Sequence, residues 1–194
     1  MYKRFGLNGF AVLCLLAGGS VHAEQAPGFF VGAGVGQAKV KFDQGPYDES
    51  DTGFKVFGGY NVNNYFSAEL AYVDGGEGNR EAVETPPAVI GPPIKVTFKV
   101  GFTGVNFSLV GRVPLTDAVA VFGKLGYASY DMKSTYSGSY FTHGYEDKSS
   151  DKDLSYGGGV AFSFGKFDLR AEYETISINA GDFNMLSLSG VYRF

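Results

Sequence analysis

Residues 186–194 read Leu-Ser-Leu-Ser-Gly-Val-Tyr-Arg-Phe and end on an aromatic residue. Counted back from Phe194 in steps of two, one face of this segment carries Tyr192, Gly190, Leu188 and Leu186. The other face carries Arg193, Val191, Ser189, Ser187 and Met185. Alternation with a period of two predicts a β-strand with lipid on one side and a packed interior on the other, as in the wall of a transmembrane β-barrel.

The other end of the sequence predicts export from the cytoplasm. Basic residues precede an apolar segment over residues 10–17, and Val21-His22-Ala23 has the small-x-small pattern of a cleavage site. We expect cleavage between Ala23 and Glu24, so that residues 1–23 are a secretory signal peptide and residues 24–194 form the barrel domain. The apolar segment is much shorter than the roughly 20 residues of a membrane-spanning helix.

The composition argues against several kinds of chemistry. Cys14 is the one cysteine, and it follows Leu13 inside the apolar segment, whereas a lipidation site requires a small residue there. We therefore expect no lipid anchor and, after cleavage, no disulfide or thiol chemistry. The formal net charge of −4 does not indicate nucleic-acid binding. No metal site or other cofactor is expected from the pattern of His and acidic residues.

Alternating segments separated by turn residues recur eight times along the chain. They cover residues 29–40, 52–61, 66–74, 98–112, 118–130, 153–164, 167–176 and 184–194. We therefore predict an all-β fold, an eight-stranded antiparallel transmembrane β-barrel. The connections after the second, fourth and sixth segments are short, whereas those after the first, third and fifth are long and polar. This asymmetry is typical of periplasmic turns and extracellular loops.

Three long extracellular loops are expected at residues 41–51, 75–95 and 131–152, with a shorter fourth at 177–183. The second contains Pro86-Pro87 and Pro92-Pro93, which are incompatible with a strand ladder. In the fourth segment, Phe98, Val100 and Phe102 are out of phase with Val105, Phe107 and Leu109. We therefore expect a bulge or a strand start near Gly101–Gly104.

The outward faces are apolar, with aromatic residues near both ends of the strands. Those near the short turns are Tyr60, Phe66, Phe164, Phe167, Tyr192 and Phe194, and those toward the long loops are Tyr72, Tyr127, Tyr156 and Tyr173. Aromatic side chains prefer the headgroup level of a bilayer, so two girdles are predicted. Tyr192 and Phe194 also have the character of a C-terminal assembly signal.

The inward faces combine small residues with charges. The charged ones are Lys55, Glu69, Arg112, Lys124, Arg170, Glu172 and Glu174. We interpret Glu69, Lys124, Arg170 and Glu172 as a network of balanced charge that plugs the lumen, because buried charges require partners. Two alternatives remain: the charges solvate a wet lumen, or they form a gate for a narrow water path. A wide pore is not expected, because an eight-stranded barrel is just filled by side chains.

Several motifs resemble the transmembrane domain of the OmpA family, in strand order and over nearly the whole predicted barrel. They are Phe57-Gly58-Gly59-Tyr60-Asn61-Val62-Asn63-Asn64-Tyr65, Ala68-Glu69-Leu70-Ala71-Tyr72, Arg112-Val113-Pro114-Leu115-Thr116-Asp117, Lys124-Leu125-Gly126, Gly158-Gly159-Val160, Arg170-Ala171-Glu172-Tyr173 and Met185-Leu186-Ser187-Leu188. The resemblance implies an interior charge network, associated with gating, at Glu69, Lys124, Arg170 and Glu172. The sequence departs from the family at Val110 and Ala161, where a further inward Lys and Glu are expected. The peptidoglycan-binding domain of full-length members is not expected here.

Three functions are compatible with this sequence. The leading one is a non-enzymatic structural or surface-interaction protein, integral to the outer membrane of a Gram-negative bacterium. Its expected partners are outer-membrane lipid and lipopolysaccharide, the insertion machinery and periplasmic chaperones, and a surface ligand bound through the extracellular loops. The second is a narrow gated channel for ions or small solutes. The third is a lipid A-modifying enzyme, but His143 is the one histidine of the predicted barrel and stands in a predicted loop, where we expect a surface rather than a catalytic role.

Overall fold

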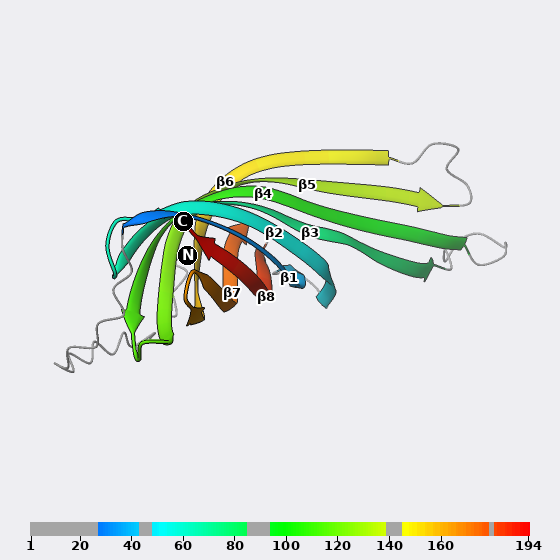
Figure 1. The fold of residues 1–194 in the computed structure, drawn as a ribbon. Coiled ribbons are helices and arrows are strands. Elements are labelled where there is room, and N and C mark those ends of the chain that lie inside the picture. Colours follow the sequence, from blue (N-terminus) through cyan, green and yellow to red (C-terminus); the bar gives the residue numbers. More distant parts are fainter. Residues whose placement is uncertain (1–26, 43–47, 85–93, 139–144, 179–180) are drawn as a thin grey trace, which may run out of the picture.

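The computed structural model describes residues 27–42, 48–84, 94–138, 145–178 and 181–194 (Figure 1). Its elements are β1 (Gly28–Phe42), β2 (Asp48–Asn61), β3 (Phe66–Glu84), β4 (Ile94–Pro114), β5 (Val119–Gly138), β6 (Tyr145–Phe164), β7 (Phe167–Ile178) and β8 (Gly181–Arg193). The predicted all-β fold with eight strands is therefore confirmed. The predicted signal peptide, with Cys14 and the cleavage site between Ala23 and Glu24, lies outside the described residues.

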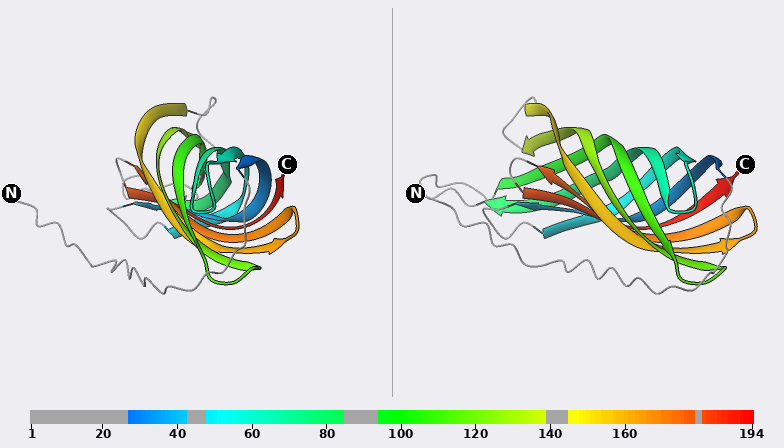
Figure 2. Two further views of the ribbon diagram at one scale, coloured as in Figure 1. Left: turned by 60° about the vertical axis from the view of Figure 1, so that its left-hand side comes forward. Right: turned by 90° about the vertical axis from the view of Figure 1, so that its left-hand side faces the viewer.

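Each strand pairs antiparallel with the next, and β8 pairs with β1 to close the barrel (Figure 2). The closing ladder runs from Phe30 opposite Arg193 to Phe42 opposite Gly181. A closed ring of strands satisfies the backbone hydrogen-bonding groups on both sides of every strand, which a bilayer requires. No helix in the described part of the chain is long and apolar enough to cross a membrane.

Side chains alternate between the two faces of the wall as the period-two pattern predicts. Leu109 and Leu125 point outward and are 64% and 59% exposed, whereas the preceding Ser108 and Lys124 are 2% and 6% exposed. An apolar surface that extends around the whole barrel is unusual for a protein in water. It is the expected surface of a barrel that faces lipid.

Polar side chains and a glycine build the short turns at the periplasmic end. Between β2 and β3, Asn63 Oδ1 accepts hydrogen bonds from the backbone N–H groups of Tyr65 (2.8 Å) and Phe66 (2.9 Å). Between β4 and β5, Thr116 Oγ1 likewise accepts hydrogen bonds from the backbone N–H groups of Ala118 and Val119. Gly165, with a φ of +62°, forms the two-residue turn between β6 and β7, where a side chain would be strained.

The predicted long loops are wrong over much of their length, because the strands continue through them. β3 and β4 extend to Glu84 and from Ile94, and β5 and β6 extend to Gly138 and from Tyr145. These four strands pair with one another along the extension and project well past the other strands (Figures 1 and 2). We call residues 77–84, 94–101, 131–138 and 145–154 the extracellular sheet. The loops predicted at 41–51 and 177–183 are also shortened by strand residues, and the proline-rich tract from Pro86 to Pro93 lies outside the described residues.

The bulge expected on β4 near Gly101–Gly104 lies on β3 instead. β4 pairs with β5 without interruption, whereas β3 has two residues, Gly75 and Gly76, where β4 has only Phe102. Gly76 has a φ of +77°, which a residue with a side chain rarely adopts. The apolar residues of β4 change from even to odd positions for another reason. Phe102 points inward and packs against Phe183 and Tyr130 at the extracellular end of the lumen.

Candidate functional site

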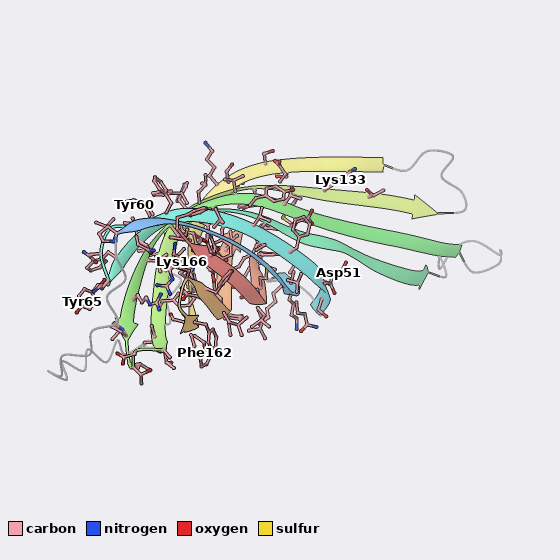
Figure 3. All side chains as sticks on the ribbon, viewed as in Figure 1. Asp51, Tyr60, Tyr65, Lys133, Phe162 and Lys166 are labelled. Carbon is pink, nitrogen blue, oxygen red and sulfur yellow. The ribbon has the colours of Figure 1, made fainter. Side chains whose placement is uncertain are left out.

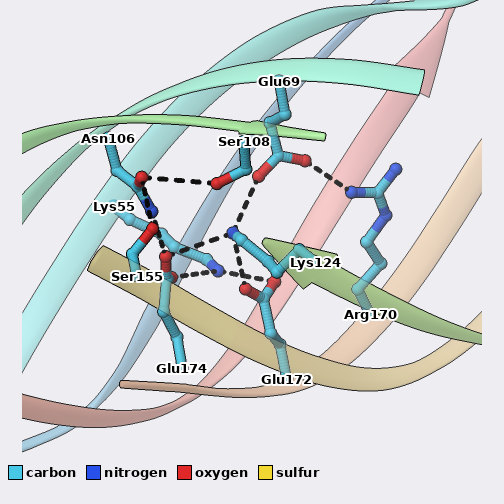
Figure 4. Close-up of polar contacts among 9 residues, drawn as sticks. All are labelled: Lys55, Glu69, Asn106, Ser108, Lys124, Ser155, Arg170, Glu172 and Glu174. Carbon is cyan, nitrogen blue, oxygen red and sulfur yellow. Dashed lines mark hydrogen bonds and ion pairs between the residues drawn. The ribbon is translucent and has the colours of Figure 1, made fainter. Parts of the chain in front are cut away.

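The inward charges meet in one cluster in the lumen (Figure 4). Lys124, from β5, lies at its centre. Its Nζ is 3.0 Å from Glu69 Oε1 on β3, 2.8 Å from Glu172 Oε1 and 3.3 Å from Glu174 Oε1 on β7. β4 separates β5 from β3, and β6 separates β5 from β7. The intervening strands place the small residues Ser108, opposite Glu69, and Gly157, opposite Glu174, at this level, so three carboxylates can converge on one ammonium group.

Arg170 extends the cluster toward the periplasmic end. Its Nη1 donates a hydrogen bond of 2.9 Å to Glu69 Oε2. The guanidinium carbon also lies 5.1 Å from the ring centroid of Phe30 and 5.5 Å from those of Phe57 and Phe122. A guanidinium group can pair with a carboxylate at its edge while its plane contacts aromatic rings, which lysine cannot do equally well. The structure thus brings together all four residues of the predicted network.

Lys55 and Glu174 belong to the same cluster, although they are not among the four residues of the predicted network. Lys55 Nζ lies 2.7 Å from Glu172 Oε2 and 3.7 Å from Glu174 Oε2. Strand parity had already placed both residues in the lumen. The available signal was the spacing of Arg170, Glu172 and Glu174, which puts three charges in a row on the inner face of β7.

A small polar group supports the extracellular side of the cluster. Asn106 Nδ2 donates a hydrogen bond of 2.5 Å to Glu174 Oε1, and Asn106 Oδ1 accepts bonds from Ser155 (2.7 Å) and Ser108 (3.3 Å). These contacts fix the orientation of the Asn106 amide and of the Glu174 carboxylate. Nothing in the sequence distinguished Asn106 from other inward polar residues.

The cluster is electrically balanced and shielded from solvent. It holds three cations and three carboxylates, and none of the six residues is more than 6% exposed. At an effective dielectric of about 20, opposite charges about 4 Å apart attract by about 4 kcal/mol. Removal of one member from such a group leaves a buried charge without compensation, at a cost of roughly 3 to 5 kcal/mol.

Apolar residues border the charges on both sides. On the extracellular side, the Phe102 ring stacks on Phe183 with 3.8 Å between ring centroids and on Tyr130 with 5.6 Å. On the other side, Val110 and Ala161 pack against Phe122. These are the two positions at which the sequence resemblance implied further charges. Here they contribute a small apolar layer instead.

A second ionic group lies nearer the periplasmic end. The buried Asp168 is 3.0 Å from Arg193 Nη2 and 3.6 Å from Arg112 Nη1. Arg112 also donates to Ser163 Oγ (3.0 Å), and Arg193 donates to the carbonyl of Gly165 (2.5 Å). The group therefore ties β8 to β7, to the β6–β7 turn and, across the lumen, to β4. Strand parity predicts that Arg112 faces the lumen, but nothing in the sequence indicates that Asp168 and Arg193 join it.

The predicted assembly-signal residues lie on the outer face at the periplasmic end. Tyr192 contacts the rings of Phe167 and Phe194 at centroid distances of 5.0 and 5.2 Å. Phe194 is 69% exposed, and its backbone N–H bonds to the carbonyl of Phe29 (3.0 Å). Figure 3 shows other outer-face aromatic residues at this end, among them Tyr60 and Tyr65 beside the β2–β3 turn. The predicted surface residue His143 lies outside the described residues.

A closed, eight-stranded antiparallel barrel with an apolar outside and a charged interior is an integral outer-membrane protein. The sequence confirms this class, because residues 9–194 match the outer membrane protein beta-barrel domain. The chain belongs to this family, and it is an OmpA-family outer-membrane β-barrel.

One curated relative is similar in sequence, and two solved structures have the same fold. The chain is 28% identical over 206 residues to outer membrane protein A of Salmonella typhi, a match that covers 95% of this chain and 54% of that protein. The chain thus spans about half the length of this curated relative. The crystal structure of Ail from Yersinia pestis, in complex with the heparin analogue sucrose octasulfate, is similar with a TM-score of 0.60 and 21% identity over 87% of this chain and 99% of Ail. Neisserial surface protein A has a TM-score of 0.58 and 15% identity over 88% of this chain and 100% of that chain.

Proposed function

We propose that this chain is a non-enzymatic outer-membrane protein that acts through its extracellular sheet, above a lumen plugged by the ionic cluster of Lys55, Glu69, Lys124, Arg170, Glu172 and Glu174. The observation that carries the proposal is the continuation of β3, β4, β5 and β6 beyond the rest of the barrel. The pairs Arg80 opposite Phe98 and Lys133 opposite Lys148 belong to this extension. An ordered sheet that projects from the membrane offers a rigid, exposed surface for a ligand, and binding residues are concentrated on exposed segments that a rigid scaffold positions.

The ionic cluster supports a closed lumen. Its six charges neutralise one another within the interior, with stacked aromatic rings on one side and an apolar layer on the other. Passage of an ion would require several of these contacts to separate together. We interpret the cluster as a structural plug, and the residues of the originally predicted network, Glu69, Lys124, Arg170 and Glu172, as its centre.

A narrow gated channel is the second candidate. The observation in its favour is that the Lys124 ammonium group has three carboxylate partners within 3.3 Å. If the ammonium group moves from one carboxylate to another, the cluster can rearrange and open a path for water or ions. The apolar layer of Val110, Phe122 and Ala161 favours the plug, since it leaves fewer charged partners for such an exchange.

The absence of catalysis is part of the proposal, and it is supported by membership of the outer membrane protein beta-barrel family. The lipid A-modifying alternative depends on His143, and mass spectrometry of lipid A from cells with and without the protein tests it directly.

The expected partners follow from location. Outer-membrane lipid and lipopolysaccharide contact the apolar wall, and the insertion machinery and periplasmic chaperones recognise the nascent chain through Tyr192 and Phe194. A surface ligand binds the extracellular sheet. Ail is described with a heparin analogue, so heparin is a reasonable first probe for this chain.

The test compares cells that carry the full chain with cells that carry a barrel in which both hairpins of the extracellular sheet are shortened to the rim. Adherence to heparin-coated and protein-coated surfaces is measured, together with the heat-modifiable gel mobility of the barrel. The proposal predicts that shortening abolishes adherence and leaves the barrel folded. Equal adherence by both strains would contradict it.

A further inference from the structure

The second ionic group, formed by Arg112, Asp168 and Arg193, carries more positive than negative charge. It contains two guanidinium groups and one carboxylate, whereas the six-residue cluster on its extracellular side is balanced. Two further charged residues at the periplasmic end, Asp117 and Lys166, are exposed on turns and have opposite signs. The group therefore keeps a surplus of one positive charge inside the periplasmic mouth of the lumen, and such a surplus attracts an anion.

Several polar atoms of this group have no hydrogen-bond partner. The Asp168 side chain is 0% exposed, yet neither of its carboxylate oxygens accepts a hydrogen bond. Its contacts with Arg193 Nη2 at 3.0 Å and Arg112 Nη1 at 3.6 Å are ion pairs without the geometry of hydrogen bonds. The Nε atom of Arg193 is also buried without an acceptor. Because buried polar atoms are almost always paired, the group has both donors and acceptors left for a further molecule.

The group is reached from the periplasmic side. At the extracellular end of the lumen, the rings of Phe102, Tyr130 and Phe183 stack on one another and are buried. At the periplasmic end, the side chains of Arg112 and Arg193 are 15% and 18% exposed. Solvent from the periplasm thus reaches the guanidinium groups, while the carboxylate between them stays shielded. A recess with low-dielectric walls concentrates its potential on an entering ion.

We infer that the periplasmic mouth of the lumen binds one inorganic phosphate ion between Arg112, Arg193 and Asp168. Guanidinium groups match the oxygen atoms of phosphate in a fork geometry, and the surplus positive charge favours an anion. The Asp168 carboxylate selects among anions. It repels an oxyanion that has only acceptor oxygens, but it accepts a hydrogen bond from the P–OH group that phosphate retains at neutral pH.

Other anions of similar shape satisfy the group less well. Sulfate is fully ionised at neutral pH, so it brings no donor for Asp168. The phosphodiester of a phospholipid headgroup carries no P–OH either. A water molecule has donors and acceptors but no charge, so it leaves the positive surplus uncompensated. The inference goes beyond the proposed function, because it concerns the periplasmic side of the plug and not the extracellular sheet.

The experiment uses the refolded full barrel in detergent micelles, in a buffer without phosphate at neutral pH. Isothermal titration calorimetry measures the binding of inorganic phosphate and of sulfate. We expect phosphate to bind at one site per barrel and sulfate to bind at least about tenfold more weakly. Addition of phosphatidylglycerol to the micelles should leave the affinity for phosphate unchanged.

Three variants test the assignment of the residues. Asp168→Asn removes the selecting charge, so sulfate should bind at least about tenfold more tightly than it binds the unaltered barrel. Arg193→Gln should weaken phosphate binding about tenfold, because it removes the surplus charge. Lys166→Gln is the matched control, since Lys166 is an exposed base on the neighbouring β6–β7 turn (Figure 3), and it should bind phosphate like the unaltered barrel.

Heat-modifiable gel mobility shows whether each variant is folded. If Asp168→Asn does not fold, the comparison of Arg193→Gln with Lys166→Gln decides the question. The inference is overturned by a lack of phosphate binding, by equal binding of sulfate, by equal losses in these two variants, or by competition from phosphatidylglycerol. None of these results bears on the proposed function, which depends on the adherence of cells with and without the extracellular sheet.

Discussion

Arg170 has two kinds of partner, the Glu69 carboxylate at 2.9 Å and the rings of Phe30, Phe57 and Phe122. Arg170→Ala should lower the free energy of unfolding by about 3 kcal/mol, because it leaves Glu69 buried with Lys124 as its remaining cation. Arg170→Lys, the matched control, keeps the charge and should cost less. Urea unfolding of the refolded barrel measures both values.

The same account predicts coupling between Arg170 and Glu69. Removal of both side chains also removes the uncompensated charge, so the double variant should lose less stability than the sum of the single variants. Strictly additive losses would show that the two residues do not depend on each other in the folded barrel.

Asp168 joins two arginines from strands that are not neighbours. Asp168→Asn should lower the free energy of unfolding by about 2 kcal/mol, since Arg112 and Arg193 remain partly exposed and can be solvated. The loss should fall to near zero when Arg112 and Arg193 are already replaced by glutamine. A full loss in that background would assign the effect to packing of the Asp168 side chain rather than to its charge.

At the scale of elements, β8 combines closure of the barrel with a terminal aromatic pair. Deletion of Phe194 removes its hydrogen bond to Phe29 and its ring contact with Tyr192. If these residues are also read during assembly, deletion should reduce insertion in cells more than refolding in detergent. The two yields are compared by heat-modifiable gel mobility, and equal reductions would limit Phe194 to a packing role.

The strands that face lipid could be predicted from the sequence, because lipid on one side imposes strict alternation. Outside the membrane, no lipid face imposes this alternation. A strand there can be held by ladder hydrogen bonds alone, so the sequence does not predict the extensions of β3 to β6. Phe102 illustrates this limit of the alternation rule. Its side chain points inward and stacks on Phe183, at a level where the outward face no longer needs to be apolar. The phase change on β4 therefore reflects an inward apolar residue, and the bulge lies on β3.

The candidate site was predictable to a similar extent. Parity placed Lys55 and Glu174 in the lumen beside the four residues of the predicted network. Parity does not give the height of a residue across the barrel, which depends on the stagger between strands. The pairing of Lys55 with Glu172, and of Arg193 with Asp168, thus required the three-dimensional structure.

At the scale of the whole molecule, we make one prediction from the export signal and one from the closed barrel. The protein isolated from outer membranes should begin at Glu24, and it should migrate differently before and after boiling, because a closed ladder opens only when all its seams separate. N-terminal sequencing and gel electrophoresis test the two statements. Recovery of a chain that still contains residues 1–23, or of a soluble periplasmic form, would contradict them.

The most direct test of the closed lumen is single-channel recording of the refolded barrel in planar bilayers. The balanced cluster around Lys124 and its apolar borders predict no sustained conductance for the unaltered protein. Arg170→Ala, which removes one cation and opens the contacts with three rings, should produce brief openings. Steady conductance by the unaltered barrel would contradict the plug and favour the gated channel.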